Sequence, residues 1–162
     1  MLFRSILVFT DPSLLPKFRF LPSTVRVIGV PLEDFELYRI AMSYSRELPV
    51  HRNKEKDTKE FFALMNNKIE FVKKAMEYCE DETLIWIDYA LLKVVKNRST
   101  VLERLKEIHS RTYSKMTLPG CWPLSSRSFS VDQIAWFFCG GFAILPRHYV
   151  NTFFAHCKNV LT

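Results

Sequence analysis

The chain has 162 residues, of which 48% are hydrophobic and 14% aromatic, and it contains only four Gly. This composition predicts one globular domain spanning residues 1–162 and excludes a disordered or low-complexity chain. The formal net charge of +6 favours anionic partners, which include nucleic acid, a membrane surface and phosphorylated small molecules. Charge alone does not choose among them.

Three apolar runs predict buried strands. The run SILVFTD (5–11) is closed by a turn signal at Asp11-Pro12, and the run TVRVIGV (24–30) is rich in β-branched residues. The third, ETLIWIDYALLKVV (82–95), carries an aspartate in its middle. If residues 84–87 form the strand, Asp88 emerges at its tip.

The spacing of apolar residues predicts four helices, over residues 32–45, 57–79, 99–111 and about 147–160. In the second of these Asp57 is expected to be the N-cap and Glu60 to complete a capping box. Ser99 or Thr100 is expected to cap the third. Helices that alternate with continuous apolar strands predict an α/β fold, with a mostly parallel central sheet and helices on both faces.

Two features predict a cytoplasmic protein. The four cysteines are widely spaced and form no CxxC pair, which favours reduced thiols over disulfides or zinc ligands. The apolar run at residues 6–9 meets Asp11 and Pro12 too soon for a signal peptide or a membrane span. We therefore expect no membrane span and a location in the cytoplasm.

Asp88 is the residue that most needs an explanation. A carboxylate within a buried run is costly unless it is paired, hydrogen-bonded or bound to a metal. In an α/β sheet, ligands bind at the carboxyl ends of the strands, where both Asp11 and Asp88 are expected. There Asp88 can hold a divalent cation that bridges nucleotide phosphates. Alternatively, it accepts hydrogen bonds from a turn or pairs with a nearby Lys or Arg.

Three segments occur in an order that resembles a known family: FFALMNNKIEFVKKAM (61–76), IWIDYALLKV (85–94) and WFFCGGFAILPR (136–147). Together they look like the nucleotide-sugar-dependent glycosyltransferases of GT-A fold. The similarity is greatest to small versions in large DNA viruses of algae and to a bacterial family of glycosyltransferase-like proteins. It implies a GT-A-like (Rossmann-like) domain that transfers a sugar from a UDP- or GDP-linked donor to a hydroxyl acceptor, in the host cytoplasm if the protein is viral.

The resemblance also implies roles for individual residues. Asp88 would bind Mn²⁺ or Mg²⁺ and thereby the donor diphosphate, although only this first aspartate of the family's DxD motif is present. The residues expected to contact the nucleotide are Thr10, Asp11, Arg52, Asn66, Asn67 and Lys68. Those expected near the donor or acceptor sugar are Tyr89, Cys139, Gly140 and Gly141. If the enzyme inverts, it also needs a carboxylate base. Asp132 is the candidate by elimination, since it is the only acidic residue between Ser110 and the end of the chain.

Simpler alternatives stay open at each of these positions. Thr10 and Asp11 can merely open a turn, the polar residues at 66–68 can form a solvated helix face, and the glycine pair can mark a bulge. Two other functions also stay open: a non-catalytic nucleotide-sugar-binding relative, and a basic nucleic-acid-binding domain. Related sequences carry more chain after the last helix, so we expect that a C-terminal segment is lacking, that a partner supplies it, or that the base has been lost.

Overall fold

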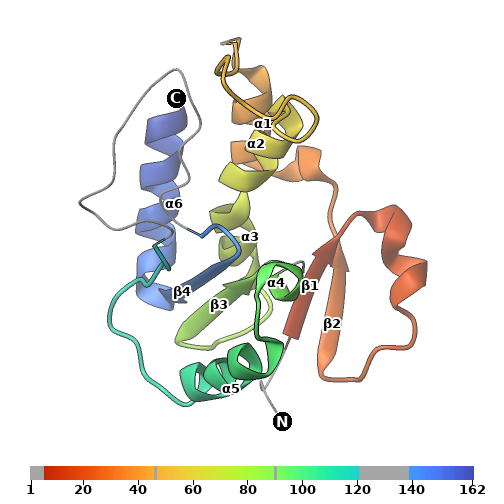
Figure 1. Ribbon diagram of the computed structural model, residues 1–162, viewed down its shortest axis with the longest axis vertical. Helices are drawn as coiled ribbons and strands as arrows, with labels where there is room; N and C mark the ends of the chain where they lie inside the picture. The colour runs from red at the N-terminus through yellow and green to blue at the C-terminus, as the bar shows by residue number, and fades with distance from the viewer. Residues whose placement is uncertain (1–5, 46, 90, 121–138) are drawn as a thin grey trace.

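The structure, a computed structural model, describes residues 6–45, 47–89, 91–120 and 139–162. These residues form a mixed α/β structure in which helices surround two small sheets (Figure 1). In one sheet β1 (Ile6–Thr10) and β2 (Val25–Gly29) run parallel. In the other, β3 (Thr83–Ile87) and β4 (Phe142–Pro146) run antiparallel.

The expected α/β class is therefore confirmed in its coarse form. A single, mostly parallel central sheet is not what the described residues form, because β4 pairs antiparallel with β3 from Thr83 opposite Pro146 to Ile87 opposite Phe142. Hydrophobic periodicity identifies a buried strand but is the same for both strand directions, so it could not predict this pairing. Antiparallel strands at the edge of an otherwise parallel sheet are common in mixed folds.

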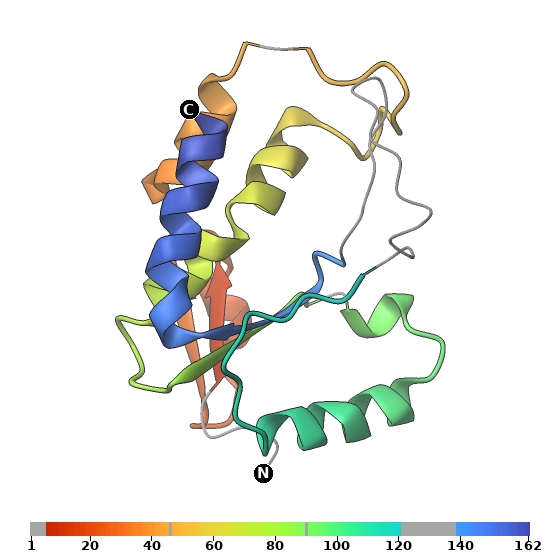
Figure 2. The same ribbon diagram turned by 90° about the vertical axis from the view of Figure 1, so that its left-hand side faces the viewer.

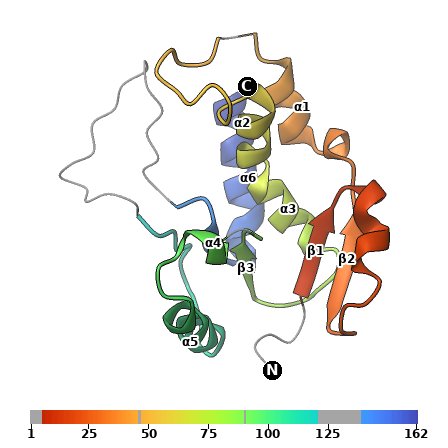
Figure 3. The ribbon, with the colours of Figure 1, turned by 45° about the vertical axis from the view of Figure 1, so that its right-hand side comes forward.

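The connection from β1 to β2 is a 3-10 helix, η1 (Pro12–Phe18), which packs beside β2 (Figure 3). A Cβ atom on Gly29 of β2 would lie 2.8 Å from Leu15 Cδ1 and 3.1 Å from the Cα of Pro12. The absence of a side chain at Gly29 therefore permits this close approach.

The helices of the described residues are η2 (Leu32–Asp34), α1 (Glu36–Ser43), α2 (Lys59–Asn66), α3 (Lys68–Ala75), α4 (Leu91–Val94), α5 (Arg98–His109) and α6 (Arg147–Leu161). The bounds of α6 agree with the prediction. The N-cap of α5 is Asn97 rather than Ser99 or Thr100. Its side-chain oxygen accepts a hydrogen bond from the N–H of Thr100 at 3.1 Å.

The long helix predicted over 57–79 is formed as α2 and α3, which are separated at Asn67. Its N-cap is Thr58 rather than Asp57, so the predicted capping box does not form. The hydroxyl of Thr58 accepts a hydrogen bond from the N–H of Phe61 at 3.2 Å. Both candidates are good capping residues, and the extended backbone at Thr58 decides between them.

The core lies between the β3–β4 sheet and helices α3 and α6. It includes the fully buried Leu37 of α1 and Val150 of α6, together with Leu84 of β3. The next residue, Ile85, points to the other face, where it lines the same cavity as Ile108 of α5. Helices α3 and α6 therefore cover one face of this sheet, and α5 lies on the side of the other face (Figure 2).

Three of the four cysteines lie in the described residues. Cys79, Cys139 and Cys157 each carry a free, half-buried thiol. Burial raises the pKa of Cys157, which keeps this thiol protonated and unreactive at neutral pH. None of the described helices is long and apolar enough to cross a membrane.

Candidate functional site

Asp88 stands at the carboxyl end of β3, where the sequence predicts it. Its backbone N–H donates to the carbonyl of Gly141 at 2.8 Å, and its own carbonyl accepts from the N–H of Leu91 at 2.9 Å. The backbone of Asp88 is thus tied to the start of β4 and to the first residue of α4. Its side chain is 33% exposed, so the carboxylate lies at the surface edge of the sheet rather than inside it.

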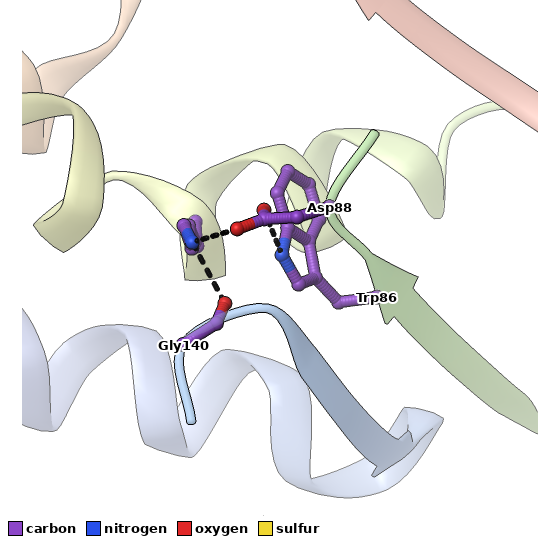
Figure 4. A network of polar contacts seen from close by, with 4 residues as sticks. Trp86, Asp88 and Gly140 are labelled. Atoms are coloured by element: carbon purple, nitrogen blue, oxygen red, sulfur yellow. Dashed lines mark hydrogen bonds and ion pairs between the residues drawn. The ribbon is translucent and has the colours of Figure 1, made fainter. Parts of the chain in front are cut away.

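Residues from three separate parts of the chain meet around this carboxylate (Figure 4). Lys68 Nζ donates to Asp88 Oδ2 at 2.7 Å and to the carbonyl of Gly140 at 2.7 Å. The indole Nε1 of Trp86 donates to Asp88 Oδ1 at 2.9 Å. We call Lys68, Trp86, Asp88 and Gly140 the Lys68 cluster. Asp88 thus forms an ion pair with Lys68, as one of the alternatives from the sequence predicts. This ion pair offsets the cost of placing a carboxylate within an apolar run.

The fold brings these side chains together through the periodicities of a strand and a helix. Trp86 and Asp88 are two residues apart in sequence, which places them on one face. The Trp86 ring stacks on Phe71 of α3, with ring centroids 5.8 Å apart and planes at 29°. Lys68 lies three residues before Phe71 and therefore on the same face of α3. The aromatic contact thus holds α3 at the place from which Lys68 reaches Asp88.

The glycine pair has a steric rather than a conformational role, since no described residue has a positive φ. A Cβ atom at Gly140 would lie 2.7 Å from Met65 Cε and 3.4 Å from Lys68 Nζ. At Gly141 it would lie 3.3 Å from Leu91 Cδ1, an approach that a small shift can relieve. The absence of a side chain at Gly140 therefore leaves room for the side chains of Met65 and Lys68. Its approach to a sugar stays a prediction.

Two other residues expected near a sugar flank the Lys68 cluster. Tyr89 follows Asp88 directly, and its side chain is almost fully exposed. Cys139 precedes Gly140, and its backbone N–H donates to the carbonyl of Pro119 at 2.8 Å. Both residues lie beside the Lys68 cluster in the chain, and a role for either at a sugar stays a prediction.

Thr10 ends β1 and Asp11 opens the turn that follows, as the simpler alternative predicts. Asp11 caps η1 through a hydrogen bond of 2.8 Å that its carboxylate accepts from the N–H of Ser13. Hydrogen bonds from the hydroxyl and N–H of Ser13 lower the pKa of Asp11. No hydrogen bond or ion pair found among the described residues links either residue to the Lys68 cluster, and nucleotide contact by them stays a prediction.

Of the four residues expected at the nucleotide around α2, only Lys68 joins the Lys68 cluster. Arg52 donates to a carbonyl of its own loop, which precedes α2. Asn66 is exposed and its amide donates to a carbonyl of its own helix. Asn67 is fully buried, and neither polar atom of its side chain has a hydrogen-bond partner in the part of the chain that the structure describes. The solvated-face alternative thus applies to Asn66 and not to Asn67.

The residues around Asp88 can be tested for their fit to the Mn²⁺ or Mg²⁺ that the resemblance implies. Such ions require several oxygen ligands and are usually held by one or two carboxylates together with substrate phosphates. Here both oxygens of Asp88 already accept hydrogen bonds, one of them from an ammonium group. Residues 6–120 and 139–162, apart from positions 46 and 90, contain no group of three or more His, Cys, Asp or Glu side chains that could hold a metal. The ammonium of Lys68 at Asp88 Oδ2 therefore does not fit a resident metal ion on the same carboxylate.

The expected catalytic base, Asp132, lies outside the described residues. Trp86 is the member of the Lys68 cluster that sequence reasoning missed. Its signal was the strand period of two, which places residue 86 on the face of residue 88. Met65 was missed as well, and its contact with Gly140 depends on tertiary packing that no local pattern encodes.

Comparisons with known proteins do not assign the chain. No family model, no curated protein and no solved structure matches it. The functional conclusion therefore depends on the residues of the site and on the resemblance described above.

Proposed function

We propose that the chain binds a nucleoside diphosphate sugar at the edge where β3 ends and β4 begins, and that it transfers the sugar to a hydroxyl group of an acceptor. The fold in this proposal is of GT-A type, with UDP or GDP as the nucleotide. The sugar and the acceptor are left open.

One observation carries this proposal. Lys68, Asp88 and Gly140 are far apart in sequence, yet two hydrogen bonds of 2.7 Å from the ammonium of Lys68 join them at the carboxyl end of β3. These are positions that the resemblance assigns to the nucleotide, the diphosphate and the sugar. In open parallel α/β sheets, ligands bind outside the carboxyl ends of the strands. Because β3 pairs antiparallel with β4, this rule applies here only through the GT-A fold that the proposal assumes. The resemblance and the chemistry of these residues therefore favour the same ligand class.

The reaction would break the bond between the anomeric carbon and the donor diphosphate, and the electron pair would leave with the diphosphate. The acceptor oxygen would form the new bond and pass its proton to a base, for which Asp132 is the candidate. Negative charge grows on the departing diphosphate, so a fixed cation beside it lowers the barrier. Lys68 supplies a fixed cation at this edge of the sheet.

Release of UDP or GDP from a panel of nucleoside diphosphate sugars tests the proposal, with and without Mn²⁺ and with simple sugars as acceptors. We expect turnover with at least one donor. Asp88→Ala removes the acceptor that positions Lys68 and should lower turnover by about 10²-fold, the usual effect of losing one electrostatic contact to a transition state. Asp81→Ala removes an exposed carboxylate just before β3 and should leave turnover unchanged.

The non-catalytic alternative is a binding protein for the same ligands. The observation that favours it is that the sequence reads Asp88-Tyr89-Ala90, so the second aspartate of the DxD motif is missing. Thermal stabilisation by UDP or GDP without release of nucleotide from any donor would support it, because a ligand that binds only the folded protein raises the midpoint of unfolding. The absence of both stabilisation and turnover with every nucleotide tested would contradict the proposal.

A further inference from the structure

We infer that the ammonium group of Lys68, and not a divalent metal ion, is the cation that holds the diphosphate at this site, so that nucleoside diphosphates bind equally well without metal. This inference depends on the proposed function, because it names the group that contacts the donor. It departs from the metal-assisted mechanism that the resemblance implies for Asp88.

Lys68 is held in place by two hydrogen bonds and by its position in a helix. Its Nζ atom lies 2.7 Å from Asp88 Oδ2 and 2.7 Å from the carbonyl oxygen of Gly140. Its side chain is only 16% exposed. Lys68 is the first residue of α3, and its backbone is therefore fixed by the helix. A lysine that is ordered in this way loses little conformational entropy when a ligand arrives.

Lys68 also has one N–H group that is free to donate to a ligand. A lysine ammonium carries three N–H donors, and the two contacts above use two of them. Within the part of the chain that the structure describes, Lys68 has no third acceptor, and its Nζ lies 5.8 Å from the centroid of the Trp86 ring. That distance is near the outer limit of a cation–π interaction. The remaining N–H can therefore bind a phosphate oxygen.

A metal ion would compete with Lys68 for the carboxylate of Asp88. The ammonium already lies at Asp88 Oδ2, and the indole N–H of Trp86 lies at Oδ1. Two cations on one carboxylate repel each other, and the described residues contain no group of three or more His, Cys, Asp or Glu side chains that could hold a metal ion. The donor set therefore favours a bound ammonium over a bound metal.

This assignment gives Asp88 a positioning role. Its carboxylate fixes Lys68, and its negative charge partly cancels that of the ammonium. Asp88→Asn keeps the size of the side chain and one oxygen acceptor, which can stay on Lys68. It removes the negative charge and turns the acceptor at the indole N–H of Trp86 into a donor. An incoming diphosphate would then meet a net positive charge, so this variant should bind it at least as tightly as the wild type. If Asp88 bound a metal, the same substitution would weaken binding.

Lys68→Met gives the opposite pattern. The methionine side chain replaces the lysine stem and keeps much of its packing, but it carries no charge and no N–H donor. If Lys68 is the cation, the variant should lose affinity for the diphosphate. If a metal is the cation, the variant should bind as well as the wild type or better, because Asp88 is then free to bind the ion.

The test is calorimetric titration of UDP and GDP into wild type, Lys68→Met and Asp88→Asn, each in EDTA and in Mn²⁺. We expect the wild-type Kd to agree within about twofold in the two buffers, a rise of at least about tenfold in Lys68→Met, and no rise in Asp88→Asn. Lys74→Met removes one lysine charge from the same helix, away from the Lys68 cluster, and controls for the change in net charge. Circular dichroism melts check that each variant is folded.

Two results would overturn the inference, and they can be told apart. Binding that needs Mn²⁺, survives Lys68→Met and is lost in Asp88→Asn would show that a metal is the cation, and the proposed function would stand. Absence of UDP and GDP binding in both buffers would contradict the inference together with the proposed donor site.

Discussion

Replacement of Arg147 by Met should lower the free energy of unfolding by about 2–3 kcal/mol, because a charged donor that satisfies helix-end carbonyls contributes about that much. Arg147 is the first residue of α6, and its guanidinium donates to the carbonyls of Cys79 at 2.7 Å and Met76 at 3.0 Å. These carbonyls follow the end of α3. The side chain thus joins two core helices, and Met would retain only the packing of its stem.

Urea denaturation followed by circular dichroism measures this effect. The matched control is Arg111→Met, since Arg111 is mostly exposed and its ion pair with Glu107 spans 3.7 Å. Exposed pairs of this kind contribute less than about 1 kcal/mol. Equal stability losses in the two variants would show that the bonds from Arg147 to the end of α3 do not stabilise the fold.

The second large effect is expected at Glu70. Its two carboxylate oxygens accept hydrogen bonds from the backbone N–H groups of Glu36 at 2.8 Å and Leu37 at 2.7 Å. These groups lie in the first turn of α1, whose own N-cap, Phe35, makes no side-chain cap bond. A residue of α3 therefore caps α1. Glu70→Gln turns one acceptor into a donor that faces an N–H group, and should cost about 1.5–3 kcal/mol.

Thermal unfolding is the measurement for Glu70→Gln. A loss of this size corresponds to a fall in Tm of about 3–12 °C for a chain of this length. Glu77→Gln, at an exposed position whose carboxylate pairs with Lys74 at 3.4 Å, should change Tm by less than about 2 °C. A Glu70→Gln protein with the Tm of the wild type would mean that solvent caps α1 equally well.

Local patterns predicted the elements better than their ends. The strands β1, β2 and β3 and the helix α6 follow directly from apolar runs and helical spacing. The predicted N-cap residues of α2 and α5 were wrong. Several good capping residues lie close together at the start of each helix, and the backbone conformation decides which of them is the cap. The separation of α2 from α3 at Asn67 was also missed, although an Asn in mid-helix indicated that something was unusual there.

Long-range features could not be predicted from one sequence. The direction of β4 and the capping of α1 by Glu70 both depend on how segments distant in sequence pack. The same holds for the site. Asp88, Lys68 and Gly140 were each identified as candidates, but the ion pair itself was only one of several alternatives for Asp88. The indole of Trp86, which completes the Lys68 cluster, needed the structure.

The central claim is that UDP or GDP binds at the Lys68 cluster, and the indole N–H of Trp86 is a direct reporter because it is bonded to Asp88. The chain has three Trp, so a ¹H–¹⁵N spectrum has three indole signals, and Trp86→Phe assigns the relevant one. We expect this signal to shift saturably when UDP or GDP is added to the protein in EDTA. A nucleotide that binds without moving the Trp86 signal would place the binding site elsewhere and contradict the account.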